Sequence, residues 1–129
     1  MKLLALAAIG GALGASGRYL VGLMALRAFG IAFPYGTLIV NVLGALLMGC
    51  LVHFLAVKIN GSAELRVFLA TGVLGGFTTF SAFSLEVANM IERGDWLVSF
   101  SYVLCSLVFC VGGIFIGLMI GRVLTGGHL

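Results

Sequence analysis

Neutral hydrogen-bond donors interrupt several segments of this chain that are otherwise apolar. They are the hydroxyl, amide and phenol groups of Thr37, Asn41, Thr78, Thr79, Ser81, Ser84, Tyr102 and Ser106. A path lined by neutral donors suits a small anion that must enter and leave easily, since a fixed full charge would trap it. No spacing indicates a nucleophile with its base or a metal cluster, and Gly72–Gly76 lacks the lysine of a phosphate-binding loop. The pattern therefore predicts no enzyme.

Two phenylalanines could complete such a path. Phe80 and Phe83 stand at helical spacing and share one face. The edge of a phenyl ring carries the positive end of its quadrupole, so a small dehydrated anion could rest against two ring edges. Asn41 could donate a hydrogen bond to the same ion. Phenylalanine in a membrane helix is more commonly lipophilic filling, so the residues alone leave both interpretations open.

The stretch from Gly72 to Ser84 must position these rings, and it is poor material for a continuous helix. Gly75-Gly76 carries a large backbone entropy cost, and the β-branched pair Thr78-Thr79 competes for backbone hydrogen bonds. We expect the third apolar segment to be broken in mid-membrane near residues 75–79, after which Ser81 caps a second helical half. Backbone freed in a membrane must be buried in protein or line a polar path. Its carbonyls would suit a cation such as Na⁺, which two copies of the chain could bury between them.

The composition predicts an all-α integral membrane protein. Of the 129 residues, 62% are hydrophobic and 9% are charged, against about 25% charged in soluble domains. Four apolar segments are long enough to cross a lipid bilayer, at residues 3–26, 37–57, 65–90 and 96–124. Their short connections predict a single membrane domain over residues 1–129. Because so small a unit can scarcely enclose a pore, we expect a homodimer.

Charge excludes some partners and says little about orientation. The formal charge of +3 comes from scattered basic residues, which does not indicate nucleic-acid binding. One membrane side would have Lys2, Lys58, Arg66 and Arg122, and the other Arg27 and Arg93, with Arg18 leaning toward the second. So small a bias permits insertion in both orientations.

Residues at helical spacing form four stripes. Glycine stripes predict close helix packing; they are Gly10, Gly14 and Gly17 in the first segment and Gly113, Gly117 and Gly121 in the fourth. The polar stripes are Thr37, Asn41, Gly44 and Met48 in the second segment and Ser99, Tyr102, Ser106 and Cys110 in the fourth. Each polar stripe is either interhelical hydrogen-bonding or a track of donors for an ion, and both interpretations stay open.

Two charged residues have ambiguous places. Arg18 lies within the first apolar segment, where it could reach the nearer interface or attract anions into a vestibule. Glu86 lies one turn beyond Phe83, and we expect its carboxylate to reach the headgroup region rather than a vestibule.

The run Gly75-Gly76-Phe77-Thr78-Thr79-Phe80-Ser81-Ala82-Phe83-Ser84 resembles the signature of the Fluc (CrcB) fluoride channel family. Gly36-Thr37, Val40-Asn41, Gly44 and Gly17-Arg18-Tyr19 agree with the same pattern. The resemblance covers essentially the whole chain, and the run is specific to that family.

The resemblance implies a fluoride-selective passive channel that exports cytoplasmic fluoride across the bacterial plasma (inner) membrane. It implies an antiparallel, dual-topology homodimer with two pores and a structural Na⁺ at its centre. The pore residues would be Asn41, Phe80, Phe83, Thr37, Ser81, Tyr102 and Ser106, with Arg18 in a vestibule. The backbone carbonyls of Gly75 and Thr78 would hold the Na⁺.

This chain departs from the family pattern in places, and two other functions compete. Ala82 removes a hydroxyl beside the phenylalanines, and Cys110 and Ile114 stand where related chains can extend the polar track. The alternative is a small multidrug-resistance-type exporter, which needs a carboxylate in the first helix; the only charge well inside this segment is Arg18. A purely structural subunit would not explain the expected break.

Overall fold

A computed structural model describes residues 1–58 and 62–126, with side chains at 57 and 58 excepted. The elements in chain order are α1 (Lys2–Phe29), α2 (Tyr35–Lys58), α3 (Ala63–Arg66), the π-helix η1 (Val67–Leu74), α4 (Gly75–Phe77), α5 (Phe80–Glu92) and α6 (Trp96–Thr125). Four helical stretches are long and apolar enough to cross a membrane, because α3 to α5 together make one stretch from Ala63 to Glu92. This confirms the expected all-helical membrane fold.

The helix ends follow from local chemistry. Helix α1 stops at Phe29 because Gly30 takes a φ of 74°, and the Gly30 N–H donates to the Leu26 carbonyl at 2.9 Å. At the other end of the fold, α6 stops where Gly126 adopts a left-handed conformation. Each long helix extends slightly beyond the apolar segment expected for it, since interfacial residues join its ends.

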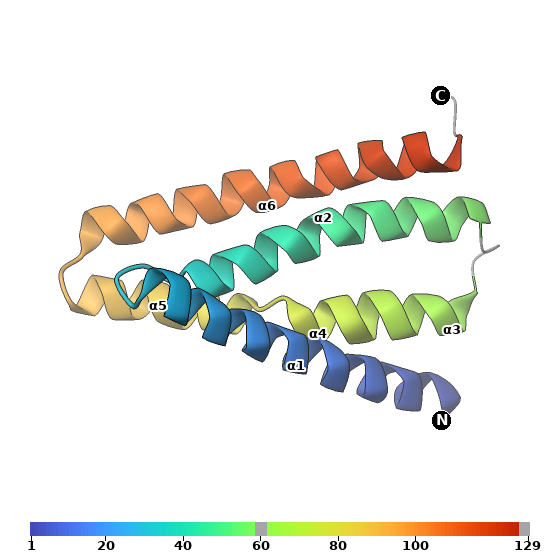
Figure 1. The fold of residues 1–129 in the computed structure, drawn as a ribbon, viewed down its shortest axis with the longest axis horizontal. Coiled ribbons are helices and arrows are strands. Elements are labelled where there is room, and N and C mark those ends of the chain that lie inside the picture. Colours follow the sequence, from blue (N-terminus) through green and yellow to red (C-terminus); the bar gives the residue numbers. More distant parts are fainter. Residues whose placement is uncertain (59–61, 127–129) are drawn as a thin grey trace.

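The four spans alternate in direction, and the two termini lie at the same end of the molecule (Figure 1). Helix α1 lies along the stretch that contains η1 and α4, while α2 lies along α6. Alternate spans are therefore packed in parallel pairs, first with third and second with fourth.

Glycines bring α2 and α6 into close contact, as their spacing predicted. Gly113 and Gly121 of α6 face the backbones of Val42 and Cys50, where an added Cβ would lie 3.4 Å and 3.1 Å from the carbonyl oxygens. Gly117 lies against Leu46 between them, with no room for a Cβ. The buried face of α6 thus continues from hydroxyls at Ser99, Tyr102 and Ser106 into glycines at Gly113, Gly117 and Gly121.

A second glycine seam joins α1 to the third span. A Cβ at Gly10 would lie 2.5 Å from the Phe68 carbonyl oxygen, and one at Gly14 would collide with Val73. Gly17 faces the Phe77 ring at van der Waals distance. These contacts confirm the packing role predicted for the glycines of the first segment.

Between α4 and α5 the backbone is extended for two residues. Thr78 has φ −82° and ψ 159°, and Thr79 has φ −153° and ψ 120°. The N-cap of α5 is Thr79, whose Oγ1 accepts the Ala82 N–H at 3.2 Å. The expectation that Ser81 caps this helix was therefore wrong, because the extended conformation that an N-cap needs ends at Thr79 and Ser81 already lies in the first turn.

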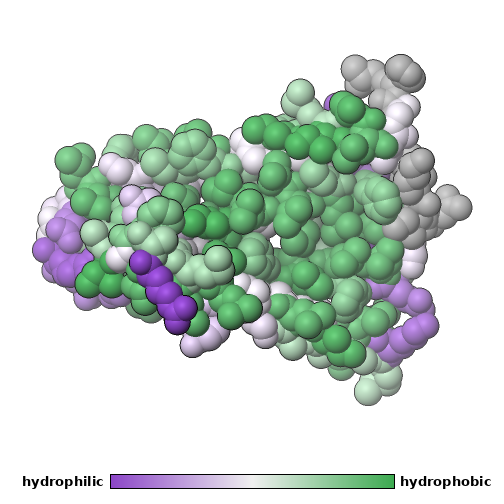
Figure 2. Space-filling view, viewed as in Figure 1, coloured by the Kyte–Doolittle hydropathy of each residue, from purple (hydrophilic) through white to green (hydrophobic). Residues whose placement is uncertain are grey.

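The outside of the molecule is apolar. Hydrophilic residues gather mainly at the two ends, with a broad hydrophobic band between them (Figure 2). Many large apolar side chains along α6 are exposed, among them Leu97, Phe100 and Phe115. Such a surface suits contact with lipid or with another copy of the chain.

Candidate functional site

The side chain of Asn41 meets the extended backbone between α4 and α5. Its Nδ2 donates to the Thr79 carbonyl at 3.0 Å, and its Oδ1 accepts the Thr79 N–H at 2.8 Å. A side-chain amide has two N–H donors, so one N–H of Asn41 is left for another acceptor. Asn41 therefore braces the third span and also presents a donor.

Two backbone carbonyls lose their helical donors at this junction. In a continuous α-helix the Thr79 N–H would donate to the Gly75 carbonyl, and the Ala82 N–H to the Thr78 carbonyl. Here these two donors bond instead to Asn41 Oδ1 and Thr79 Oγ1. The Gly75 and Thr78 oxygens thus lack their helical donors, and unwound carbonyls of this kind can coordinate a monovalent cation in membrane proteins.

A cavity of about 370 Å³, which we call the phenylalanine cavity, lies beside the extended residues. Many residues that the sequence singled out line it, among them Asn41, Thr78, Phe80, Phe83 and Ser106. The Ser106 side chain is buried, and its Oγ has no hydrogen-bond partner among the described residues. A buried hydroxyl without a partner at a cavity wall is an unmet donor.

Aromatic rings continue from this cavity along α5 and α6. The rings of Phe80 and Phe83 have centroids 5.6 Å apart and are tilted by 39°. Phe83 in turn lies 5.2 Å from the ring of Tyr102, which is completely buried. Phe80 is 79% exposed, so one wall of the cavity is open in a single copy of the chain.

Glu86 joins two of the predicted polar residues. Its Oε1 accepts a hydrogen bond from the Thr37 hydroxyl at 2.6 Å, and its Oε2 accepts one from the Tyr102 hydroxyl at 2.7 Å. We expected the Glu86 carboxylate to reach the headgroup region, and its depth in a membrane stays a prediction. In the structure it turns toward two hydroxyl donors, one on α2 and one on α6. The signal that could have found it is an acidic residue one turn from Phe83 within a membrane span.

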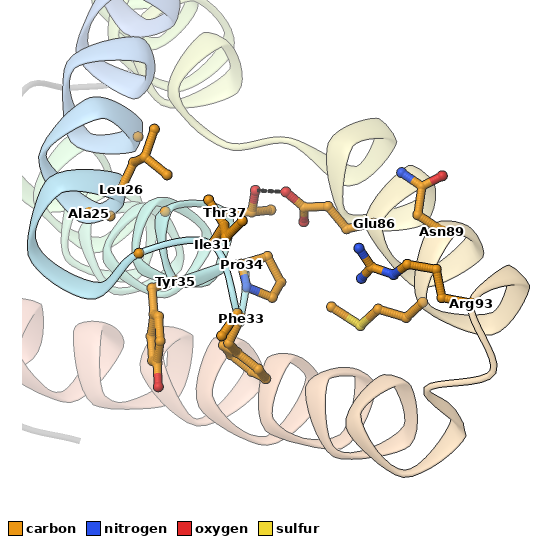
Figure 3. A pocket seen from close by; sticks show the side chains of 15 residues that line it. Ala25, Leu26, Ile31, Phe33, Pro34, Tyr35, Thr37, Glu86, Asn89 and Arg93 are labelled. Carbon is orange, nitrogen blue, oxygen red and sulfur yellow. Dashed lines mark hydrogen bonds between the residues drawn. The ribbon is translucent and has the colours of Figure 1, made fainter.

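A second cavity, of about 390 Å³, lies between the α1–α2 connection and α5; we call it the loop cavity. The Thr37–Glu86 hydrogen bond forms part of its wall (Figure 3). Asn89, near the end of α5, also lines this cavity, and Arg93, just beyond that helix, points toward it (Figure 3). Arg93 Nε lies 3.4 Å from an oxygen of Asp95. The Tyr102 ring connects the two cavities, because it lies 5.3 Å from the ring of Phe33, which lines the loop cavity, and 5.2 Å from that of Phe83, which lines the phenylalanine cavity.

Arg18 lines neither the loop cavity nor the phenylalanine cavity. It lines a third cavity of about 350 Å³, together with Gly22, Thr37 and Thr79. Thr37 borders both this cavity and the loop cavity. The Ser81 side chain is exposed, with its Oγ 3.3 Å from Thr79 Oγ1, so it lies beside the phenylalanine cavity rather than in its lining.

Side chains of the usual metal-binding types do not cluster here. In the described part of the chain, no three His, Cys, Asp or Glu side chains come close enough to hold a metal ion. Any cation at this site would therefore depend on oxygens such as those of Gly75 and Thr78.

The sequence of the chain matches a protein family and several curated proteins. The family model described as "CrcB-like protein, Camphor Resistance (CrcB)" matches residues 5–118. A protein of Agrobacterium fabrum is 51% identical over 119 residues, covering 92% of this chain and 95% of its own. One of Caulobacter sp. is 54% identical over 123 residues, covering 95% and 96%. A third, of Hyphomonas neptunium, is 53% identical over 118 residues, covering 91% and 93%. All three are named "Fluoride-specific ion channel FluC".

Proposed function

The chain belongs to the CrcB family, and we propose on this premise that it is a channel through which fluoride leaves the cytoplasm down its own gradient. It is a multi-pass membrane protein, in bacteria a protein of the inner membrane, and it is a channel rather than an enzyme. The observation that carries the proposal is the phenylalanine cavity, which is lined by two phenylalanine rings, an amide and a buried hydroxyl that has no partner among the described residues.

Fluoride would enter this cavity with most of its water removed. The remaining N–H of Asn41 and the hydroxyl of Ser106 would donate hydrogen bonds to it. The edges of Phe80 and Phe83 would add favourable electrostatic contact without a full charge. A larger halide gains less from these close contacts, which gives the site its selectivity.

The other predicted pore residues have supporting roles in this proposal. Thr37 and Tyr102 hold Glu86 at the boundary between the loop cavity and the phenylalanine cavity. A passing ion would accept hydrogen bonds from these two hydroxyls in place of the carboxylate. Arg18 would attract anions into the third cavity, and Ser81 would offer its exposed hydroxyl near the extended residues.

The channel would work as an antiparallel homodimer with dual topology. The open wall beside Phe80 supports this assembly, because a second copy could close the cavity.

We also propose that the extended residues Thr78 and Thr79 form the expected mid-membrane break in the third span. A Na⁺ held by the carbonyls of Gly75 and Thr78 from both copies would then lie at the centre of the dimer. This site is supported by the Thr79 and Ala82 N–H groups, which would donate to these carbonyls in a continuous helix but bond to other acceptors here.

Ion efflux from liposomes tests the proposal. Purified protein reconstituted into liposomes should release fluoride much faster than chloride, with no need for a pH gradient. Protein-free liposomes give the leak rate. Equal fluoride and chloride efflux, or efflux that requires an imposed proton gradient, would contradict a fluoride-specific passive channel.

A further inference from the structure

One of the three cysteines lines the phenylalanine cavity. Cys50, Cys105 and Cys110 are all free thiols, and all are partly buried. Of these, Cys110 belongs to the cavity lining, whereas Cys50 packs at the seam between α2 and α6 beside Gly121. Cys105 is not part of the cavity lining. The chain therefore offers two internal controls for any property of Cys110.

A second residue on the same wall, Ser106, indicates that a small molecule can bind there. Ser106 lies one helical turn before Cys110 and lines the same cavity. Its side chain is more than nine-tenths buried, and its hydroxyl has no partner among the described residues. Around these two groups the wall is apolar, with Val111 and Ile114. The cavity of about 370 Å³ has room for a group of several atoms beside the thiol.

We propose that Cys110 is a modification site, at which a small neutral thiol-reactive electrophile forms an adduct inside the phenylalanine cavity. With methyl methanethiosulfonate, the Cys110 sulfur attacks the sulfenyl sulfur of the reagent. A new S–S bond forms, the S–S bond of the reagent breaks, methanesulfinate leaves, and the thiol proton passes to water. The cysteine is oxidised to a mixed disulfide while the sulfonyl group of the reagent is reduced to sulfinate.

The adduct would stop fluoride movement, a consequence that rests on the proposed function. It replaces the weak S–H donor of Cys110 with an apolar methylthio group one turn from the Ser106 hydroxyl. An anion that has lost its water cannot recover hydrogen bonds from such a surface. Modification at Cys50 or Cys105 would leave the lining of the cavity unchanged.

The test uses the full chain in liposomes, as wild type and as Cys50→Ser, Cys105→Ser and Cys110→Ser. Fluoride efflux is measured before and after methyl methanethiosulfonate, and each variant is normalised to its own untreated rate. Mass spectrometry of peptides identifies the modified cysteines. We expect efflux to be lost in wild type, Cys50→Ser and Cys105→Ser, kept in Cys110→Ser, and restored by dithiothreitol.

Two outcomes would overturn the inference. One is a Cys110 that stays unmodified while Cys50 or Cys105 reacts, and the other is a modified Cys110 with unchanged efflux. Failure of the proposed function looks different, because untreated protein would then pass no fluoride. In that case the mass measurement still decides whether Cys110 is the accessible thiol.

Discussion

The side-chain amide of Asn41 on α2 exchanges two hydrogen bonds with the backbone of Thr79, 38 residues away in the sequence. The exchange resembles the pairing of two residues in neighbouring β-strands. In an apolar environment the extended backbone at Thr79 would otherwise need other partners, since each unmet group costs several kcal/mol. The junction of α4 and α5 is therefore held in place by a neighbouring span.

The first prediction concerns Asn41. Asn41→Leu keeps the branched shape of the side chain but leaves the Thr79 N–H and carbonyl without the partners that Asn41 provides. We expect the protein to lose about 1 kcal/mol or more per hydrogen bond, and to lose fluoride efflux as well. Thermal unfolding in detergent measures the first effect. Asn89→Leu, at an exposed asparagine near the end of α5, is the matched control and should unfold near the wild-type temperature.

The second prediction concerns the two hydroxyls on Glu86. Thr37→Val and Tyr102→Phe each remove one donor to this carboxylate. Each should lower stability by about 1.5–3 kcal/mol, the range for hydrogen bonds to charged groups. The double variant should differ from the sum of the single ones, since both donors share one acceptor. A strictly additive double-mutant cycle would show that Glu86 does not couple them.

Tyr35→Phe provides the control for that cycle. Tyr35 also packs against other aromatic rings but is 39% exposed at the start of α2. Removing its hydroxyl should leave the stability nearly unchanged.

The periodicity and composition of the sequence predict the membrane spans and the glycine contacts between them, but not the hydrogen-bond partners of the buried polar residues. Helix-length apolar segments predicted the four spans, and small residues at helical spacing predicted the seams at Gly14 and Gly117. These features depend on the neighbours of a residue along one helix. The partner of Asn41 lies 38 residues away and those of Glu86 lie 49 and 16 residues away, and choosing them requires the packing of three spans. For the same reason the cap of α5 was assigned to Ser81 instead of Thr79.

The third prediction tests the seam between α1 and the third span. Gly14→Ala places a methyl group against the Val73 backbone, which cannot move aside as a flexible side chain can. Overpacking of this kind costs about 1–3 kcal/mol. Gly11→Ala is the control on the same helix, because a Cβ there meets nothing within 4 Å. Thermal unfolding should separate the two variants, and equal melting temperatures would argue against this packing.

The fourth prediction concerns the two rings. Phe80→Ile and Phe83→Ile remove the ring edges while keeping an apolar side chain, so fluoride efflux should fall in both. Phe83→Ile should also loosen Tyr102, whose ring is 5.2 Å away. Phe100→Ile on the exposed face of α6 is the control, at a side chain that is 66% exposed. Efflux that matches this control in both pore variants would remove the rings from the mechanism.

The fifth prediction separates the proposed Na⁺ from the conduction of fluoride. If the carbonyls of Gly75 and Thr78 hold Na⁺, the purified protein should melt at a higher temperature in Na⁺ than in N-methylglucamine at equal ionic strength. A ligand at 100 times its dissociation constant adds about 2.7 kcal/mol to stability. The Na⁺ effect should shrink in Asn41→Leu, because Asn41 is the residue that draws the Thr79 N–H away from Gly75. It should persist in Asn89→Leu. A melting temperature that is the same in both cations, in wild type and variants alike, would leave the two carbonyls without a bound ion.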